Sequence, residues 1–133
     1  MVVMLMSVKK IVFTEKAPKP IGPYSQGVRV SSFLFISGQI PIDPVTGQLV
    51  EGDFTTKVRR VLDNLKNIVE AAGGSLRSIV KVNVYLRDIG KFSEFNSVYS
   101  EYFLEDPPAR SVVEVSNLPR GVELEVEAIA FIP

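Results

Sequence analysis

The sequence predicts an α+β domain in which two helices cover one face of a mixed β-sheet. Two segments repeat hydrophobic residues with the period of a helix, and several shorter segments are rich in β-branched and aromatic residues. Glycine and proline separate these segments, and the predicted order is β-β-β-α-β-α-β-β. Two amphipathic helices can cover only one face of such a sheet. The other, half-apolar face is then open, which favours burial against another subunit.

The first part of the chain alternates predicted strands with loops rich in proline and glycine. Residues 8–13 form the first predicted strand. Residues 17–27 hold too many breakers for a helix or a central strand, so they are predicted to form a loop over the core. Residues 28–30 and 33–37 are predicted to pair as a hairpin, and a turn is predicted at 43–47.

Residues 53–72 carry the clearest helical pattern. Asp53 is the predicted N-cap, and two glycines follow the helix and end it. A second helix is predicted over residues 91–103, with its aromatic side chains on one side, and two prolines follow it. The hydrophobic face of the first helix consists of Val58, Val61, Leu62, Leu65, Ile68, Val69 and Ala72.

The second half of the chain contains three further predicted strands. Residues 79–86 alternate hydrophobic and polar side chains. Residues 112–115 and 123–132 are the last predicted strands, joined by a turn at 119–121. In the predicted strand over residues 79–86, four side chains are predicted to share one face: Val80, Val82, Val84 and Leu86.

The composition excludes several classes of site. Without Cys or His, the chain has no disulfide, thiol nucleophile, imidazole metal ligand or Ser-His-Asp triad. Lys+Arg and Asp+Glu number 15 each, so the basic excess typical of nucleic-acid binding is missing. No apolar run approaches the length of a membrane span. We therefore expect a single cytoplasmic domain over residues 1–133, in which residues 1–7 are either a first strand or a non-essential extension.

The last predicted strand places three carboxylates on one face. Glu123, Glu125 and Glu127 share the two-residue period of a strand, so neighbours in the row stand about 7 Å apart. Such a row is typical of a solvated sheet face. One of the three could also serve a pocket as an acid, a base or a group that positions water.

Arg110 is a second candidate, because two prolines stiffen the entry to its strand and hold its direction. A guanidinium group binds a carboxylate or a phosphate through two parallel hydrogen bonds, although a surface salt bridge also explains a lone arginine. Segments 21–27 and 37–41 each place glycine beside hydroxyl or amide side chains. This pattern suits the close approach of a ligand as well as ordinary turns.

Taken together, these motifs resemble the reactive-intermediate deaminases, the RidA or YjgF group, over about residues 8–132. This family has a chorismate-mutase-like α+β fold and forms homotrimers, in which three sheets build a central barrel and ligand clefts lie between subunits. The motifs that carry the resemblance are Ile21-Gly-Pro-Tyr-Ser-Gln-Gly27, Ser37-Gly-Gln-Ile-Pro41, Asn96 within Phe95-Asn-Ser-Val-Tyr99, Pro108-Ala-Arg-Ser111 and Leu124-Glu-Val-Glu-Ala128.

The resemblance implies hydrolysis of 2-aminoacrylate and related enamine or imine acids to 2-oxo acids and ammonia. Arg110 would hold the substrate carboxylate. Glu125 would lie on the side of the attacking water, where it would position the water or act as the proton donor. An imine carbon is already electrophilic, so oriented water and a fixed anion clamp suffice without a metal or a cofactor. The residues that would line the cleft are Tyr24, Ser37, Gly38 and Asn96.

Two departures and two alternatives accompany this interpretation. Val112 stands where many members carry Cys, which excludes thiol-dependent regulation, and Val126 stands where Ile or Met is usual. One alternative is a ribonuclease or translation inhibitor, an activity also associated with the family, against which the absence of His and of net positive charge argues. The other is a catalytically silent trimeric or chaperone-like module for small acids, because the Arg110 clamp would serve binding alone.

Overall fold

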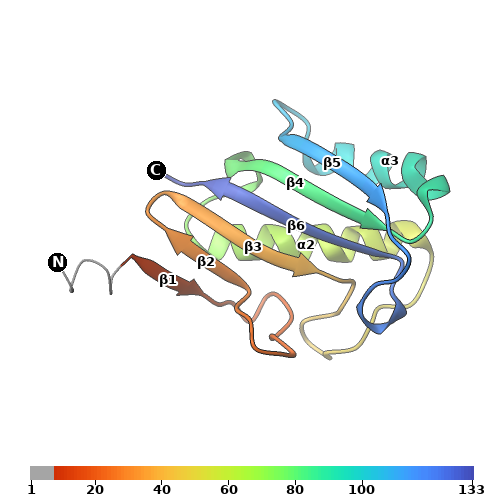
Figure 1. The fold of residues 1–133 in the computed structure, drawn as a ribbon, viewed down its shortest axis with the longest axis horizontal. Coiled ribbons are helices and arrows are strands. Elements are labelled where there is room, and N and C mark those ends of the chain that lie inside the picture. The colour runs from red at the N-terminus through yellow and green to blue at the C-terminus, as the bar shows by residue number, and fades with distance from the viewer. Residues whose placement is uncertain (1–7) are drawn as a thin grey trace.

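The computed structural model describes residues 8–133, so the expectation for residues 1–7 lies outside the described residues. Figure 1 shows one sheet with both α-helices behind it, and the element order and the mixed α+β architecture are those predicted. The strands are β1 (Lys9–Val12), β2 (Gly27–Val30), β3 (Phe33–Gln39), β4 (Ile79–Leu86), β5 (Ala109–Glu114) and β6 (Leu124–Phe131). The helices are α2 (Phe54–Ala71) and α3 (Phe92–Tyr102), with short 3-10 turns η1 (Leu76–Ser78), η2 (Ile89–Lys91) and η3 (Pro119–Gly121).

The sheet has the strand order β1-β2-β3-β6-β4-β5. Neighbouring strands are antiparallel except β4 and β5, which are parallel. The last strand of the chain therefore lies in the middle of the sheet, between β3 and β4 (Figure 1). This position brings the carboxylates of β6 next to the end of β3.

Helix α2 supplies most of the core on the covered face of the sheet. Asp53 caps it as predicted, because its carboxylate accepts a hydrogen bond from the Thr56 N–H at 2.9 Å. The predicted hydrophobic face is buried except for the partly buried Ala72, and each buried Leu or Val contributes about 1.5–3 kcal/mol through the hydrophobic effect. In the part of the chain that the structure describes, neither helix combines the length and the apolar character that crossing a bilayer requires.

The prediction for Val80 was wrong. Its side chain is 45% exposed, whereas Ile79 is buried at 4%. The register between β4 and β6 shifts between Ile79 and Lys81, so Val80 is an extra residue in the ladder and the alternation restarts after it. Strand β5 also begins at Ala109 rather than at 112, because residues with no apolar pattern pair with β4 through their backbone.

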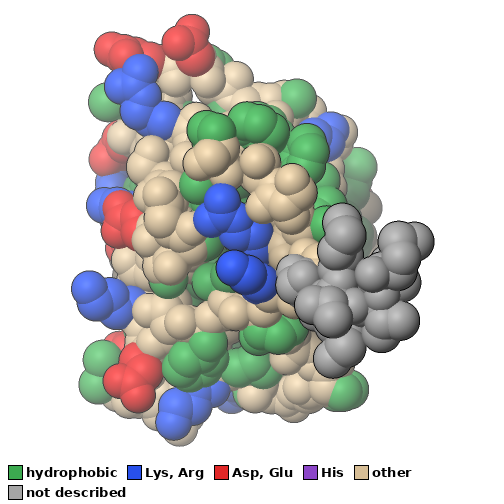
Figure 2. Space-filling view, turned by 90° about the vertical axis from the view of Figure 1, so that its left-hand side faces the viewer, with side chains coloured by type: hydrophobic (Ala, Val, Ile, Leu, Met, Phe, Trp, Pro, Cys, Tyr) green, Lys and Arg blue, Asp and Glu red, His purple; other side chains and the backbone are tan. Residues whose placement is uncertain are grey.

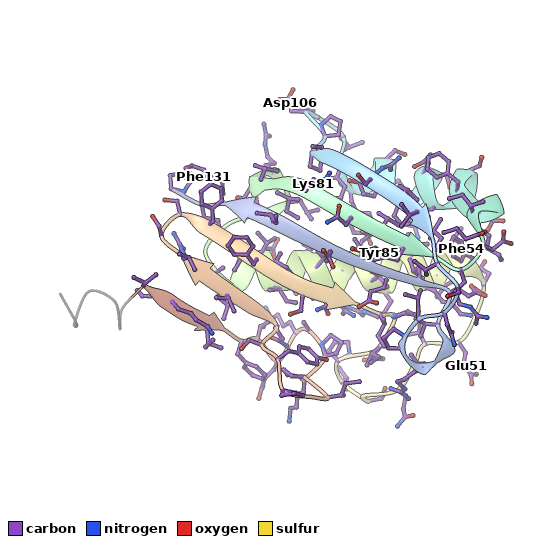
Figure 3. All side chains as sticks on the ribbon, viewed as in Figure 1. Glu51, Phe54, Lys81, Tyr85, Asp106 and Phe131 are labelled. Atoms are coloured by element: carbon purple, nitrogen blue, oxygen red, sulfur yellow. The ribbon has the colours of Figure 1, made fainter. Side chains whose placement is uncertain are left out.

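The sheet face without helices, which we call the open face, looks toward the viewer in Figures 1 and 3. One end of it is aromatic: Phe33 and Phe131 are 45% and 43% exposed, and their rings meet edge to face at 5.3 Å. Figure 3 shows Phe131, Lys81 and Tyr85 on this face, with Tyr85 the farthest of the three from the aromatic end. Figure 2 shows hydrophobic side chains reaching the right margin, the side of the open face, and acidic ones along the left.

Candidate functional site

A cavity of about 340 Å³ lies where the breaker-rich loop, β3 and β6 meet. The loop contributes Ile21 and Tyr24, β3 contributes Ser37 and Gly38, and β6 contributes Glu125. The cavity therefore brings together four predicted site residues: Tyr24, Ser37, Gly38 and Glu125. We call these four residues the carboxylate half-site. Ile21 and Ile40, which belong to the same two candidate ligand segments, add apolar wall.

Glu125 differs from its two neighbours in the predicted carboxylate row. Glu123 precedes β6, and its carboxylate lies 3.7 Å from the Lys57 ammonium of α2, so it does not belong to the row. Glu127 accepts a hydrogen bond of 3.2 Å from the Asn83 amide. Glu125 has no hydrogen bond or ion pair to any of residues 8–133, and burial, assisted by the charge of Glu127, raises the pKa of its carboxyl group. A raised pKa suits a group that donates a proton.

Gly38 leaves the space that the Glu125 carboxylate occupies. A Cβ atom added at Gly38 would stand only 2.1 Å from Oε2 of Glu125. Any other residue at this position would displace the carboxylate. The glycine is thus a steric requirement of this carboxylate position rather than of a turn.

The loop that carries Tyr24 is tied to β3 through Ser37. The Ser37 hydroxyl donates to the Ser25 carbonyl at 2.5 Å, so only its lone pairs are left for a ligand. The Tyr24 hydroxyl accepts from the Ile21 N–H at 3.2 Å, which holds the phenol against its own loop. Both hydroxyl groups therefore hold the cavity wall in place through these hydrogen bonds.

Gln26 anchors the same loop through hydrogen bonds, a role that was not predicted from the sequence. Its side chain is buried, its amide donates to the carbonyls of Thr14, Ala17 and Pro18, and its carbonyl accepts from the Thr14 N–H. A loop without strand pairing leaves such backbone groups unsatisfied. An amide side chain within a segment full of prolines was the signal that could have revealed this role.

The other two predicted residues, Arg110 and Asn96, meet at a different place, which we call the guanidinium half-site. Nη1 of Arg110 donates to Oδ1 of Asn96 at 2.8 Å. The central carbon of the guanidinium lies 4.7 Å from the ring centroid of Tyr99 and 5.5 Å from that of Phe92. Asn96 therefore contacts Arg110 through its carbonyl oxygen, which leaves only its N–H groups for a ligand.

The two half-sites lie on opposite faces of the sheet. Arg110 is paired across the sheet with Val82, which is buried under the helices. Glu125 is paired with Tyr85, on the open face. Strand β4 separates the two strands that carry Arg110 and Glu125. The predicted site residues therefore form two groups that do not meet within one chain.

Comparison with known proteins agrees with this fold. Residues 14–132 match the family model described as endoribonuclease L-PSP, and the chain belongs to this family. A RutC family protein of Pyrococcus abyssi is 58% identical over 123 residues, covering 92% of this chain and 97% of the relative. The 2-iminobutanoate/2-iminopropanoate deaminase of Bos taurus is 46% identical over 123 residues, covering 92% and 90%.

Solved structures of relatives share the whole fold. The YjgF gene product of E. coli superposes with a TM-score of 0.88 at 46% identity, covering 92% of this chain and 98% of that one. E. coli TdcF with bound serine gives a TM-score of 0.89 at 45% identity, covering 93% and 99%. The predicted resemblance to the RidA and YjgF group is confirmed. The family includes an imine deaminase, while other relatives have only a RutC family name.

Proposed function

We propose that the protein hydrolyses enamine and imine acids of the 2-aminoacrylate type to 2-oxo acids and ammonia, without a metal or a cofactor. The observation that carries the proposal is the unpartnered, half-buried carboxyl group of Glu125 held over Gly38 in a cavity. The similarity to a bovine 2-iminobutanoate/2-iminopropanoate deaminase supports the same reaction. We place the activity in the cytoplasm as part of this proposal.

The reaction needs an anion clamp and one group that moves protons. Arg110 binds the substrate carboxylate through the N–H groups that Asn96 does not use. Glu125 donates a proton to the imine nitrogen while water adds to the imine carbon, a role that the burial-raised pKa of its carboxyl group favours. The resulting carboxylate takes one proton from the added water, which leaves a carbinolamine. Glu125 passes this proton to the amino nitrogen, the C–N bond breaks as ammonia leaves, and the Glu125 carboxylate takes the remaining hydroxyl proton as the carbonyl forms. Water and imine are thereby converted into a 2-oxo acid and ammonia, with Glu125 protonated again.

The two half-sites can act on one molecule only if different chains supply them. We propose a homotrimer in which the guanidinium half-site of one subunit faces the carboxylate half-site of the next. The exposed aromatic end of the open face supports such an assembly, because Phe33 and Phe131 leave apolar surface uncovered in the single chain. Light scattering should give about three times the chain mass of 14.7 kDa, and a stable monomer would contradict the proposal.

The activity is tested by coupling a dehydratase that releases 2-aminoacrylate to this protein. We expect faster decay of the imine and faster formation of the 2-oxo acid, and a chelator should not change the rate. Decay at the spontaneous rate in the presence of the trimer would overturn the proposal. Loss of activity with a chelator, restored by a divalent ion, would instead indicate a carboxylate metal site.

Binding of small acids without turnover is the second candidate function. The E. coli relative was solved with bound serine, which shows that this relative accommodates a small amino acid. If this candidate is correct, the protein binds 2-oxobutanoate or serine but leaves imine decay unchanged. An RNA cleavage assay serves as the control for the family description as an endoribonuclease, which a chain with no His and no net charge supports poorly.

A further inference from the structure

Three side chains of α3 enclose the guanidinium of Arg110. Phe92, Asn96 and Tyr99 recur at i, i+4 and i+7 and therefore lie on one face of the helix. The guanidinium lies within 6 Å of both ring centroids, at 5.5 Å for Phe92 and 4.7 Å for Tyr99, which is the range of a cation–π contact. One helix, α3, therefore holds the Arg110 guanidinium on three sides.

The three contacts restrict different motions of the guanidinium. The hydrogen bond from Nη1 to Asn96 fixes its rotation within its own plane. Two aromatic rings restrict its tilt and occupy none of its N–H donors. Among residues 8–133, Asn96 is the sole hydrogen-bond acceptor of Arg110, so most of its five donors stay free for an anion.

Tyr99 contributes through its ring rather than through its hydroxyl group. The hydroxyl oxygen is buried and has no hydrogen-bond partner in the described part of the chain. Burial raises the pKa of Tyr99 to about 12, although the charge of Arg110 opposes this shift, so the phenol stays neutral. Tyr99 therefore contacts Arg110 through the face of its ring.

We propose that Phe92 and Tyr99 are positioning residues: their ring faces hold the Arg110 guanidinium so that its free donors meet an anionic ligand. Neither ring needs to touch the ligand. The proposal rests on the proposed function only in treating Arg110 as the anion clamp. It also predicts that the hydroxyl of Tyr99 is dispensable for this role.

The test compares Phe92→Leu with variants that keep a ring, Phe92→Tyr and Tyr99→Phe. Two measurements are made on the trimer: the NMR signal of the Arg110 Nε–H, assigned by its loss in Arg110→Lys, and the affinity for 2-oxobutanoate as the anionic probe. Phe92→Leu should move the Nε–H signal toward that of a free guanidinium and weaken binding about two- to fivefold. Phe92→Tyr and Tyr99→Phe should both retain the wild-type signal. Under turnover, Phe92→Leu should raise KM more than it lowers kcat.

Phe13→Leu is the matched control, because Phe13 is an exposed phenylalanine that follows β1, at the opposite edge of the sheet from Arg110. It should change neither measurement. An unchanged Nε–H signal in Phe92→Leu would overturn the proposal, as would a Tyr99→Phe variant that loses as much affinity as Phe92→Leu. If Phe92→Leu does not fold, Phe92→Met removes the ring with the same expected outcomes. The Nε–H signal is read without substrate, so failure of the deaminase proposal does not affect this arm.

Discussion

Arg110 and Glu125 lie on opposite faces of the same sheet, two strands apart. Arg110 contacts α3 on the face that the helices cover, and Glu125 lines a cavity on the open face. Each is prepared for a ligand in a different way, the first by aromatic contacts and a hydrogen bond, the second by burial without a partner. A single chain therefore keeps the two groups of predicted site residues apart, and in the proposed function each group is one half of a shared site.

Glu125→Gln should slow imine hydrolysis by about 10²-fold or more, because glutamine keeps the shape of the side chain and cannot transfer a proton. The measurement is kcat/KM at equal trimer content. Glu123→Gln serves as the control, since Glu123 pairs with Lys57 of α2 and should change stability by about 1 kcal/mol at most. Full activity in Glu125→Gln combined with loss in Glu127→Gln would move the catalytic role to the neighbouring carboxylate.

Gly38→Ala should lower activity while leaving the fold intact. The added methyl group would collide with the Glu125 carboxylate, which is the mobile end of a side chain and can move aside at little cost to stability. A shift of about 1 Å in a catalytic group lowers the rate by about 10²-fold. The melting temperature and kcat/KM are measured together. If the variant keeps wild-type turnover, the position of the Glu125 carboxylate seen here is not the catalytic one.

The raised pKa of Glu125 predicts a pH dependence of stability. Between its ordinary value of 4.5 and its folded-state pKa, Glu125 binds more protons in the folded chain than in the unfolded chain. Its contribution to the free energy of unfolding therefore falls as the pH rises through this window. Glu125→Gln removes this loss, so its stability relative to the wild type should be greater at about pH 8 than at about pH 4. Urea unfolding at both pH values measures the stability difference between the variant and the wild type. A difference that does not change with pH would show that the pKa of Glu125 is not raised.

Gln26→Met should destabilise the protein and weaken ligand binding together. Methionine fills a similar volume but leaves the carbonyls of Thr14, Ala17 and Pro18 without their donor. Each buried polar group that loses its partner costs about 1–3 kcal/mol. Gln48→Met, at an exposed position in the turn after β3, is the matched control and should have little effect. A Gln26→Met variant as stable as the wild type would show that the loop does not depend on this amide.

The sequence predicted the elements well where one period dominates. The helical spacing from Val58 to Ile68 requires a buried face, and the chain offers no competing arrangement for it. Val80 could not be placed, because a bulge depends on the pairing of β4 with β6 and leaves no trace in the alternation of β4 alone. The start of β5 was missed for a related reason, since its first residues are held by backbone pairing rather than by burial.

The candidate site was predictable as a set of residues but not as a geometry. The motifs identified Arg110 and Glu125, while nothing in their spacing indicates that β4 lies between their strands. The contact of Asn96 with Arg110 joins a helix to a strand across 14 positions of sequence and depends on how α3 packs. Long-range contacts of this kind appear only when the sheet order is known.

Mixing two inactive variants tests most directly whether each cleft uses Arg110 from one chain and Glu125 from another. Arg110→Ala and Glu125→Gln are unfolded together in equal amounts, refolded into mixed trimers and assayed for imine hydrolysis. If neighbouring chains supply the two residues, about one quarter of the clefts in random trimers contain both native side chains, and activity should return to about that fraction of the wild type. Each variant refolded alone is the control and should stay inactive. Mixed trimers with no more activity than the separate variants would contradict a cleft shared between chains.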